Sequence, residues 1–230
     1  AEELLGQGAF GLDLGGQGST PGAGEVDAEE EWRRLAPLVP ALARLGVPLA
    51  IDTWRVSVAR RALDAGATWL NAADGLQGDE ILAVAAAAAV PVVVPFLAGP
   101  HPKALRHVEG DPVEAIDAWF ERSLARIDAA SPALRARCVL DPGTGFAPAD
   151  WPWPDRYLYQ KQVYGQLGRL RRFGLPLYVA LPWRDTPEHA ELLDLVLAQG
   201  VEYGRAHHPD RVLAAQEARG AHAATAQPTE

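Results

Sequence analysis

The stretch "CVLDPGTGF" (138–146) places a carboxylate where a buried strand ends. Residues 138–140 are apolar, Asp141 follows directly, and a proline–glycine turn comes next. A buried carboxylate is costly unless a partner compensates for it. Asp141 therefore belongs either to a local turn or to a polar pocket that it shares with other strand ends.

Short apolar runs alternate with longer helical segments along the whole chain. The runs lie at 10–14, 48–51, 68–70, 90–96, 138–140, 175–181 and 201–206. Residues 27–45 have helical spacing, with Pro37 and Pro40 predicted to bend the helix, and Asp111–Pro112 predicts the start of another helix. This repetition predicts an α/β protein with a parallel sheet covered by helices, either closed as a barrel or open and doubly wound.

Most of these runs end in a polar or charged residue. The ends carry Asp13, Asp52, Asn71 with Asp74, Asp141, and Arg205 with His207. In a parallel barrel all the carboxyl ends of the strands face one side, where active sites are built. A single strand-terminal Asp is more often a helix cap or turn former. Five such ends in one chain favour a shared site.

Composition indicates a globular protein that binds neither nucleic acid nor membrane. The chain has 230 residues, of which 48% are hydrophobic and 22% charged, enough for a full core in one large domain. Its net charge of −9 argues against a broad nucleic-acid or anionic-membrane surface. The single cysteine, Cys138, excludes an internal disulfide framework and a multi-cysteine zinc site.

One uncharged window, residues 81–99, approaches the length of a membrane span. Pro91 and Pro95 interrupt it, and a β-branched run follows an alanine-rich one, so the window predicts a buried helix, a turn and a buried strand. The chain opens without a basic-then-apolar leader. A cytoplasmic protein is the resulting expectation.

Five segments resemble the dihydropteroate synthase family of pterin-binding barrels. They are "GLDLGG", "PLAIDTWRVSVARRALDAGATWLNAADGL", "VLDPGTGF", "PLYVAL" and "GRAHHP". The resemblance implies a TIM (β/α)8-type barrel over residues 1–219. The tail at 220–230 is polar and rich in small residues, which predicts disorder. The resemblance also implies an enzyme of folate biosynthesis that joins 6-hydroxymethyl-dihydropterin pyrophosphate to p-aminobenzoate and releases pyrophosphate, with Mg²⁺ assisting.

The resemblance assigns roles to particular residues. It implies Asp52, Asn71, Asp141 and Arg184 as the pterin-binding residues and Arg205 with His207 as the diphosphate-binding pair. Arg184, Arg205 and His207 are the candidate catalytic residues, and no metal ligand is assigned. A carboxylate and an amide suit the donor–acceptor–donor edge of a pterin, and arginine suits a phosphate.

The sequence departs from the family pattern at several places. The family's first strand, with its Asn-x-Thr-Pro-Asp-Ser-Phe-Ser-Asp-Gly-Gly loop, has no counterpart, so seven strands are expected, with the eight-strand spacing kept. The gap between 10–14 and 201–206 should be open or occupied by another segment. The glycine-rich loop at 15–22 lacks the family's arginine, and Arg184 stands where the family has lysine.

Two other functions are compatible with these residues. A non-catalytic paralogue could bind a pterin or assist a partner enzyme, and methyl-tetrahydrofolate methyltransferases share the Asp/Asn/Asp set. The pair Arg205 and His207 favours a diphosphate substrate, because a methyl donor has no diphosphate. The aromatic stretch 150–160 is predicted to pack on the barrel rim or in a homodimer rather than to cover a ligand.

Overall fold

The computed structural model describes residues 1–18 and 22–225, with side chains as far as Gly220. In that part of the chain all seven predicted strands are present. They are β1 (Leu12–Gly15), β2 (Leu49–Thr53), β3 (Trp69–Ala72), β4 (Val92–Pro95), β5 (Cys138–Asp141), β6 (Tyr178–Ala180) and β7 (Tyr203–Arg205). Every pairing between them is parallel, as strand–helix alternation predicts.

Helices connect the strands and cover their outer side. They are α1 (Glu2–Gly6), α2 (Ala28–Leu35), α3 (Val39–Ala43), α4 (Val56–Asp64), α5 (Asp79–Ala87), α6 (Pro112–Ala130), α7 (Pro132–Arg135), α8 (Trp153–Tyr164), the 3-10 helix η1 (Leu167–Phe173), α9 (Pro187–Gln199) and α10 (Pro209–Thr225). Pro37 separates α2 from α3, so the segment predicted as one bent helix forms two helices. Asp111 caps α6 by accepting hydrogen bonds from the N–H groups of Val113 at 2.7 Å and Glu114 at 3.1 Å.

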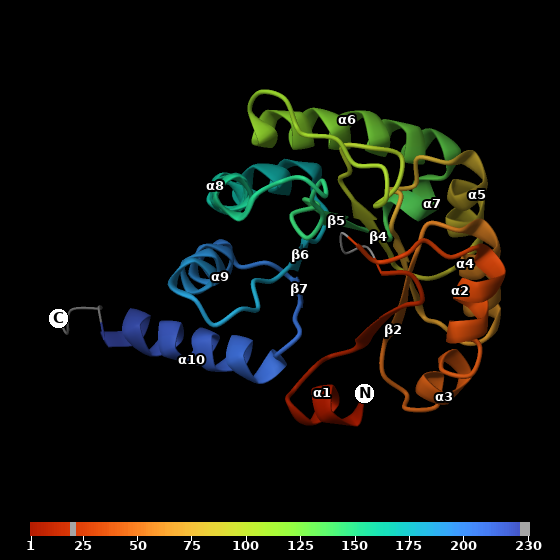
Figure 1. Cartoon of the computed structure of the whole chain (residues 1–230), viewed down its shortest axis with the longest axis horizontal. Helices are drawn as coiled ribbons and strands as arrows, with labels where there is room; N and C mark the ends of the chain where they lie inside the picture. The colour runs from red at the N-terminus through yellow and green to blue at the C-terminus, as the bar shows by residue number, and fades with distance from the viewer. Residues whose placement is uncertain (19–21, 226–230) are drawn as a thin grey trace.

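The strands follow one another around a curved sheet in chain order. Strands β1 to β5 form one hydrogen-bonded sheet, and β6 pairs with β7. A parallel bridge between Leu140 and Leu177 joins β5 to β6. Helices surround the strands on the outside (Figure 1). The molecule is thus a (β/α) barrel with seven strands in its described part, which confirms the predicted fold class.

A seam separates β1 from β7. Within the described residues these two strands exchange no backbone hydrogen bond. Side chains cross the seam instead: the Tyr178 hydroxyl donates to Asp13 Oδ2 at 2.9 Å, and the rings of Phe10 and Tyr203 lie 6.4 Å apart. Helices α1 and α10 lie next to each other beside the seam (Figure 1). The expected gap is therefore present and is bridged by side chains.

Large aromatic rings fill the barrel interior near the amino ends of the strands. Trp69 of β3 and Tyr203 of β7 meet edge to face, with ring centroids 5.2 Å apart. Tyr178 is the register partner of Tyr203, so both face the interior. These rings occupy volume inside an incomplete barrel, whose polar residues lie nearer the carboxyl ends of the strands.

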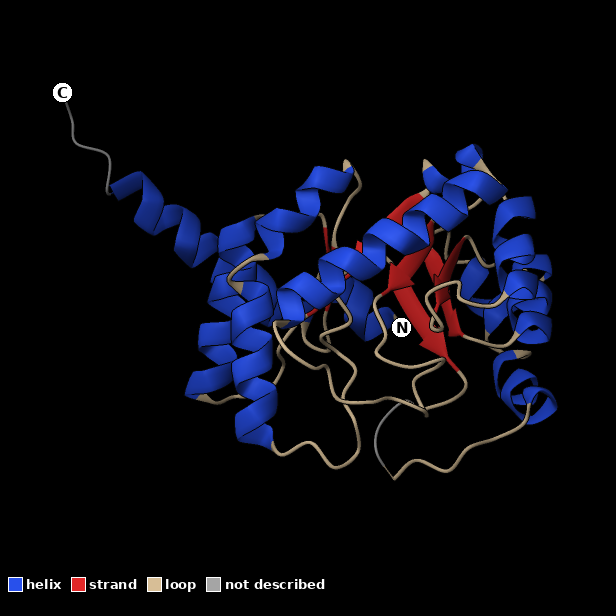
Figure 2. Ribbon diagram, turned by 90° about the horizontal axis from the view of Figure 1, so that it is seen from above, coloured by secondary structure: helices blue, strands red, loops and turns tan. Residues whose placement is uncertain are grey.

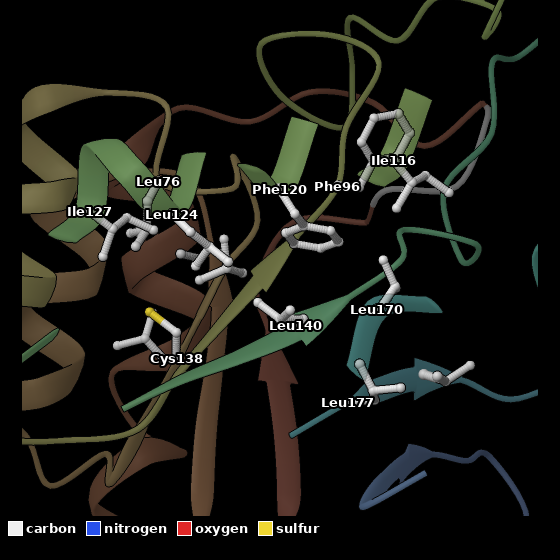
Figure 3. Packing of buried hydrophobic residues seen from close by; sticks show 14 of the residues in the cluster. Leu76, Phe96, Ile116, Phe120, Leu124, Ile127, Cys138, Leu140, Leu170 and Leu177 are labelled. Atoms are coloured by element: carbon white, nitrogen blue, oxygen red, sulfur yellow. The ribbon is translucent and has the colours of Figure 1, made fainter. Parts of the chain in front are cut away.

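The hydrophobic core lies between the strands and the helices. In its larger cluster Phe120 and Leu124 of α6 point toward Cys138 and Leu140 of β5 (Figure 3). Burying a side chain of this size stabilises the fold by about 1.5–3 kcal/mol. Burial raises the pKa of the Cys138 thiol to about 11, which makes this cysteine a core residue without nucleophilic character.

The C-terminal tail corrects one prediction. Helix α10 continues to Thr225, so residues 220–225 are helical where disorder was expected, and 226–230 lie outside the described residues. Figure 2 shows the end of α10 projecting away from the body of the protein. Alanine occupies three of the six positions from 220 to 225, and its high helix propensity outweighs the glycine at 220.

The uncharged window around residues 81–99 forms α5 and β4, as predicted, inside the larger core cluster. Across the described ranges, 1–18 and 22–225, no helix has both the length and the apolar character needed to cross a membrane.

Candidate active site

The strand register brings the predicted polar residues to one end of the barrel. Asp52 and Asn71 are direct register partners on β2 and β3, and Asp141 ends β5 opposite Pro95. Their neighbours Ile51, Leu70, Ala72 and Leu140 belong to the hydrophobic core under the helices, so all three side chains face the barrel interior. Asn71 and Asp141 are 5% and 4% exposed, whereas Asp52 keeps part of its surface open.

The turn after Asp141 explains the glycines of the motif "CVLDPGTGF". Gly143 has a φ of 73°, and a methyl group there would lie 2.1 Å from the carbonyl oxygen of Phe96. This left-handed turn directs the Gly143 N–H back to Asp141 Oδ1 at 2.8 Å. One carboxylate oxygen is thus held by the backbone, and the side chain is fixed toward the barrel interior.

Asp13 and Tyr178 join the site, although neither was among the predicted site residues. Asp13 Oδ2 accepts hydrogen bonds from Asn71 Nδ2 at 3.1 Å and from the Tyr178 hydroxyl at 2.9 Å. Asn71 therefore presents its amide oxygen away from Asp13. Asp13 carried a weak signal as one of the polar strand ends, whereas Tyr178 has none because only the barrel brings β6 opposite β1.

Burial raises the pKa values of the two principal carboxyl groups. Desolvation, reinforced by the charge of Asp13, raises the pKa of Asp52 to about 7. Desolvation also raises the pKa of Asp141 to about 7, although the Gly143 N–H and Arg205 oppose the shift. Both carboxyl groups therefore change charge close to neutral pH.

Arg205 connects these carboxyl groups with the barrel rim. Burial opposes its charge, but Tyr178, Asp13, Asp52 and Asp141 together raise its pKa, so the guanidinium stays protonated. His207, two residues further on, has its pKa lowered by burial and by Arg205, which favours the neutral imidazole at pH 7.

A pocket with a cavity volume of about 110 Å³, which we call the rim pocket, opens at the carboxyl ends of β5, β6 and β7. Its lining residues are Gly145, Trp153, Arg156, Gln160, Tyr164, Ala180, Leu181, Pro182, Trp183, Arg184, His189, Arg205 and His207. The three candidate catalytic residues, Arg184, Arg205 and His207, thus share one pocket. Because its ionisable lining groups are arginine, histidine and tyrosine, the rim pocket suits an anionic ligand.

The three carboxyl-end residues Asp52, Asn71 and Asp141 do not line the rim pocket. Arg205 is the residue that belongs to both groups, through its electrostatic interaction with the buried acids. The site therefore consists of a buried polar cluster inside the barrel and a cationic pocket at its rim.

Asp74 of the strand-end set and Trp153 of the aromatic stretch have roles different from the predicted ones. The Asp74 carboxylate accepts hydrogen bonds from the N–H groups of Leu76 at 3.1 Å and Gly78 at 3.2 Å. Asp74 therefore stabilises a local turn and is not part of the polar cluster. In the aromatic stretch, Trp151 packs against Tyr159 as expected, but Trp153 lines the rim pocket.

Comparison with known proteins places this geometry in a family. Residues 1–161 match the family model described as pterin binding enzyme. The dihydropteroate synthase of Synechocystis sp. is 35% identical over 185 residues, which are 78% of this chain and 60% of that protein. The chain therefore spans less than two thirds of this relative. It belongs to the pterin-binding enzyme family.

Solved structures agree with this assignment. The dihydropteroate synthase of Yersinia pestis, in complex with a sulfonamide drug, superposes with a TM-score of 0.81 at 27% identity, covering 97% of this chain and 84% of that one. The Xanthomonas albilineans dihydropteroate synthase with 4-aminobenzoic acid gives a TM-score of 0.81 at 26% identity, with coverage of 99% and 83%.

Proposed function

We propose that this protein is a dihydropteroate synthase-type transferase, which condenses 6-hydroxymethyl-dihydropterin pyrophosphate with p-aminobenzoate in folate biosynthesis. The observation that carries the proposal is the position of Arg205, which lines the rim pocket and interacts with the buried acids of the polar cluster. A substrate with a heterocyclic edge and a diphosphate needs both environments side by side. The named relatives support the same reaction.

Each group has a defined task in the proposed reaction. The ionised Asp141 and Asp52, with the Asn71 amide, accept and donate hydrogen bonds along the pterin edge. Arg205, His207 and Arg184 hold the diphosphate. The amine nitrogen of p-aminobenzoate attacks the methylene carbon of the pterin, the carbon–oxygen bond breaks, and pyrophosphate leaves with the electron pair while the amine loses a proton. Stabilising that leaving anion is the main contribution of the cationic pocket.

The rim pocket separates this proposal from the methyltransferase alternative, but not from a non-catalytic paralogue. A methyl-tetrahydrofolate methyltransferase has no diphosphate to bind, so three arginines in one pocket have no counterpart in its chemistry. A non-catalytic pterin-binding paralogue would keep the same contacts and lack turnover.

The family resemblance also implies Mg²⁺. Among residues 1–18 and 22–225 no three His, Cys, Asp or Glu side chains are grouped so that they could hold a metal ion. The described residues do not fit a metal site made of protein ligands alone, and no step of the proposal uses one. Mg²⁺ often binds through one or two carboxylates and substrate phosphates, so Mg²⁺ dependence, a cytoplasmic location and a homodimer stay within the proposal.

The proposal is tested by calorimetry followed by a product assay. We expect the pterin pyrophosphate to bind first and p-aminobenzoate to bind the resulting complex. Dihydropteroate and pyrophosphate should then form in equal amounts. Each measurement is made with and without added Mg²⁺. Pterin binding without product would identify the non-catalytic paralogue. Absence of pterin binding would contradict both readings.

The pH dependence of pterin binding should follow the raised pKa values. Asp52 and Asp141 have pKa values of about 7, and the ionised carboxylate is the form that accepts the pterin donors. Below pH 7 binding must first remove a proton, so affinity should fall by about tenfold per pH unit for each group that must ionise. Titrations at pH 6, 7 and 8 measure this, and a dissociation constant that is equal at all three values would refute it.

A further inference from the structure

Three side chains from different strands form one hydrogen-bonded network at the base of the polar cluster. The Tyr178 hydroxyl on β6 donates to Asp13 Oδ2 on β1 at 2.9 Å, and Asn71 Nδ2 on β3 donates to the same oxygen at 3.1 Å. Asp13 is the register partner of Ala50, two residues before Asp52, so it lies nearer the amino ends of the strands than Asp52 does. The network therefore supports Asn71 from the amino-terminal side and crosses the seam.

The charge of Asp13 fixes the direction of both hydrogen bonds. An ionised carboxylate only accepts, so the Asn71 amide must turn its nitrogen toward Asp13, and Tyr178 must donate its proton. Burial, reinforced by the charge of Asp13, raises the pKa of Tyr178 well above its usual value, so the phenol keeps that proton. The Asn71 oxygen consequently faces away from Asp13, and no described group donates to it. The amide oxygen is thus an acceptor that a ligand can use.

Asp13 is held in a position that is unfavourable for an acid. Its Oδ1 is buried and has no partner among the described residues. Its charge also raises the pKa values of two other acids, Asp52 and Asp141, whereas Arg205 compensates for these negative charges. Hydrogen bonds to the ionised form of a carboxyl group favour that form. The Tyr178 hydroxyl therefore helps to keep Asp13 ionised, which the amide orientation requires.

A neighbouring tyrosine shows the role of a ring that only fills space. Tyr203 is the register partner of Tyr178, and its ring packs edge to face on Trp69 at a centroid distance of 5.2 Å. Within the described side chains the Tyr203 hydroxyl makes no hydrogen bond. The Tyr178 hydroxyl, in the same layer of the barrel, instead reaches across the seam to Asp13. Tyr178 therefore has a polar role in addition to filling the interior.

We propose that Tyr178 is a positioning residue, which acts through Asp13 to hold the Asn71 amide with its oxygen facing the bound heterocycle. That this heterocycle is a pterin rests on the proposed function. The amide oxygen accepts a hydrogen bond from an N–H group of the ring. A reversed amide would direct its own N–H groups at that donor, and the hydrogen bond would be lost. Tyr178 thus determines which hydrogen-bond pattern the site accepts, without touching the ligand.

The sequence allows the Asn71 amide to be observed alone, because Asn71 is the only asparagine among the 230 residues. The whole chain is labelled with asparagine that carries ¹⁵N in its side-chain amide, and the two N–H signals are recorded by NMR without ligand. In Tyr178→Phe, which keeps the ring, we expect both signals to shift. Their exchange with water should become roughly 2- to 12-fold faster, as for the loss of one hydrogen bond. Tyr203→Phe is the matched control and should change neither property.

Calorimetry with 6-hydroxymethyl-dihydropterin pyrophosphate tests the consequence for binding. Tyr178→Phe should weaken the affinity roughly 2- to 12-fold. Added to Asp13→Ala, the same substitution should weaken it no further, because Tyr178 acts through Asp13. An unchanged Asn71 signal in folded Tyr178→Phe, or an equal loss of affinity in both backgrounds, overturns the positioning role. If the wild-type chain does not bind the pterin, the proposed function fails, while a shifted Asn71 signal still supports the role of Tyr178.

Discussion

Replacing Arg55 by alanine should lower the free energy of unfolding by about 3–5 kcal/mol, the cost of leaving a buried charge without its partner. Arg55 Nη1 donates to Glu31 Oε2, and the Glu31 side chain is fully buried while that of Arg55 is 14% exposed. Arg55 Nη2 also donates to the carbonyl oxygen of Val26. Removing the guanidinium leaves the Glu31 carboxylate inside the protein without compensation.

The same substitution should loosen the loop before α2. Besides Arg55, the Gln17 side chain holds this segment, accepting from the Val26 N–H at 2.8 Å and donating to the Gly24 carbonyl at 3.0 Å. Because Arg55 lies just after β2, its loss should disturb the loop beside Asp52 as well as the packing of α2 on α4.

Chemical denaturation measures this change, with Arg61→Ala as the matched control. Arg61 lies on α4 and pairs with Glu29 at 2.9 Å, but both side chains are exposed, so the loss should be about 0–1 kcal/mol. A double variant, Arg55→Leu with Glu31→Leu, should recover most of the stability, since it removes both charges. If Arg55→Ala lowers the free energy of unfolding no more than Arg61→Ala does, the buried ion pair does not stabilise the fold.

The sequence predicted those features of the molecule that depend on residues close together in the chain. Alternating strands and helices, the breaks at the prolines and the caps such as Asp111 are determined by neighbouring residues, and they occur as expected. The sequence could predict that Asp52, Asn71 and Asp141 lie at the same end of the barrel, because each ends a strand of a parallel sheet. Register then places them together without further information.

Contacts across the barrel could not be predicted in the same way. The hydrogen bond from Tyr178 to Asp13 joins residues that are 165 positions apart, and only closure of the sheet brings them together. Arg156 lies on a helix whose apolar residues show no clear face, so nothing in the spacing marks it as a pocket residue. The helical residues 220–225 were missed because a polar composition was taken as disorder, although alanine and its neighbours favour a helix.

Asp141→Asn should weaken pterin binding by about 1.5–3 kcal/mol, or roughly 10- to 150-fold, because it removes the charge from a hydrogen bond to the pterin edge. Asparagine has nearly the same shape and can still accept from the Gly143 N–H, which lies 2.8 Å from Oδ1. The loss therefore reports the charge rather than a change in the turn.

Folding stability should move in the opposite direction. The pKa of Asp141 is raised by burial to about 7 from 3.8, so the folded protein holds this proton more tightly than the unfolded chain. The contribution of Asp141 to stability therefore falls as the pH rises from about 4 to about 7, and the cost of the buried charge is complete above that range. Asp141→Asn should remove this cost and make the protein more stable at pH 8 than the wild type.

Calorimetric titration with the pterin and thermal melting, each at pH 6 and pH 8, separate the two effects. Asp74→Asn is the control, since Asp74 also follows a strand and is buried but only holds the turn to Leu76 and Gly78. Asp74→Asn should lower stability and leave pterin affinity unchanged. Asp141→Asn should lose affinity most strongly at pH 8, where the wild-type carboxylate is ionised. Equal pterin affinity of wild type and Asp141→Asn at pH 8 would exclude Asp141 from the pterin site, and the acid at the end of "CVLDPGTGF" would then be a turn former like Asp74.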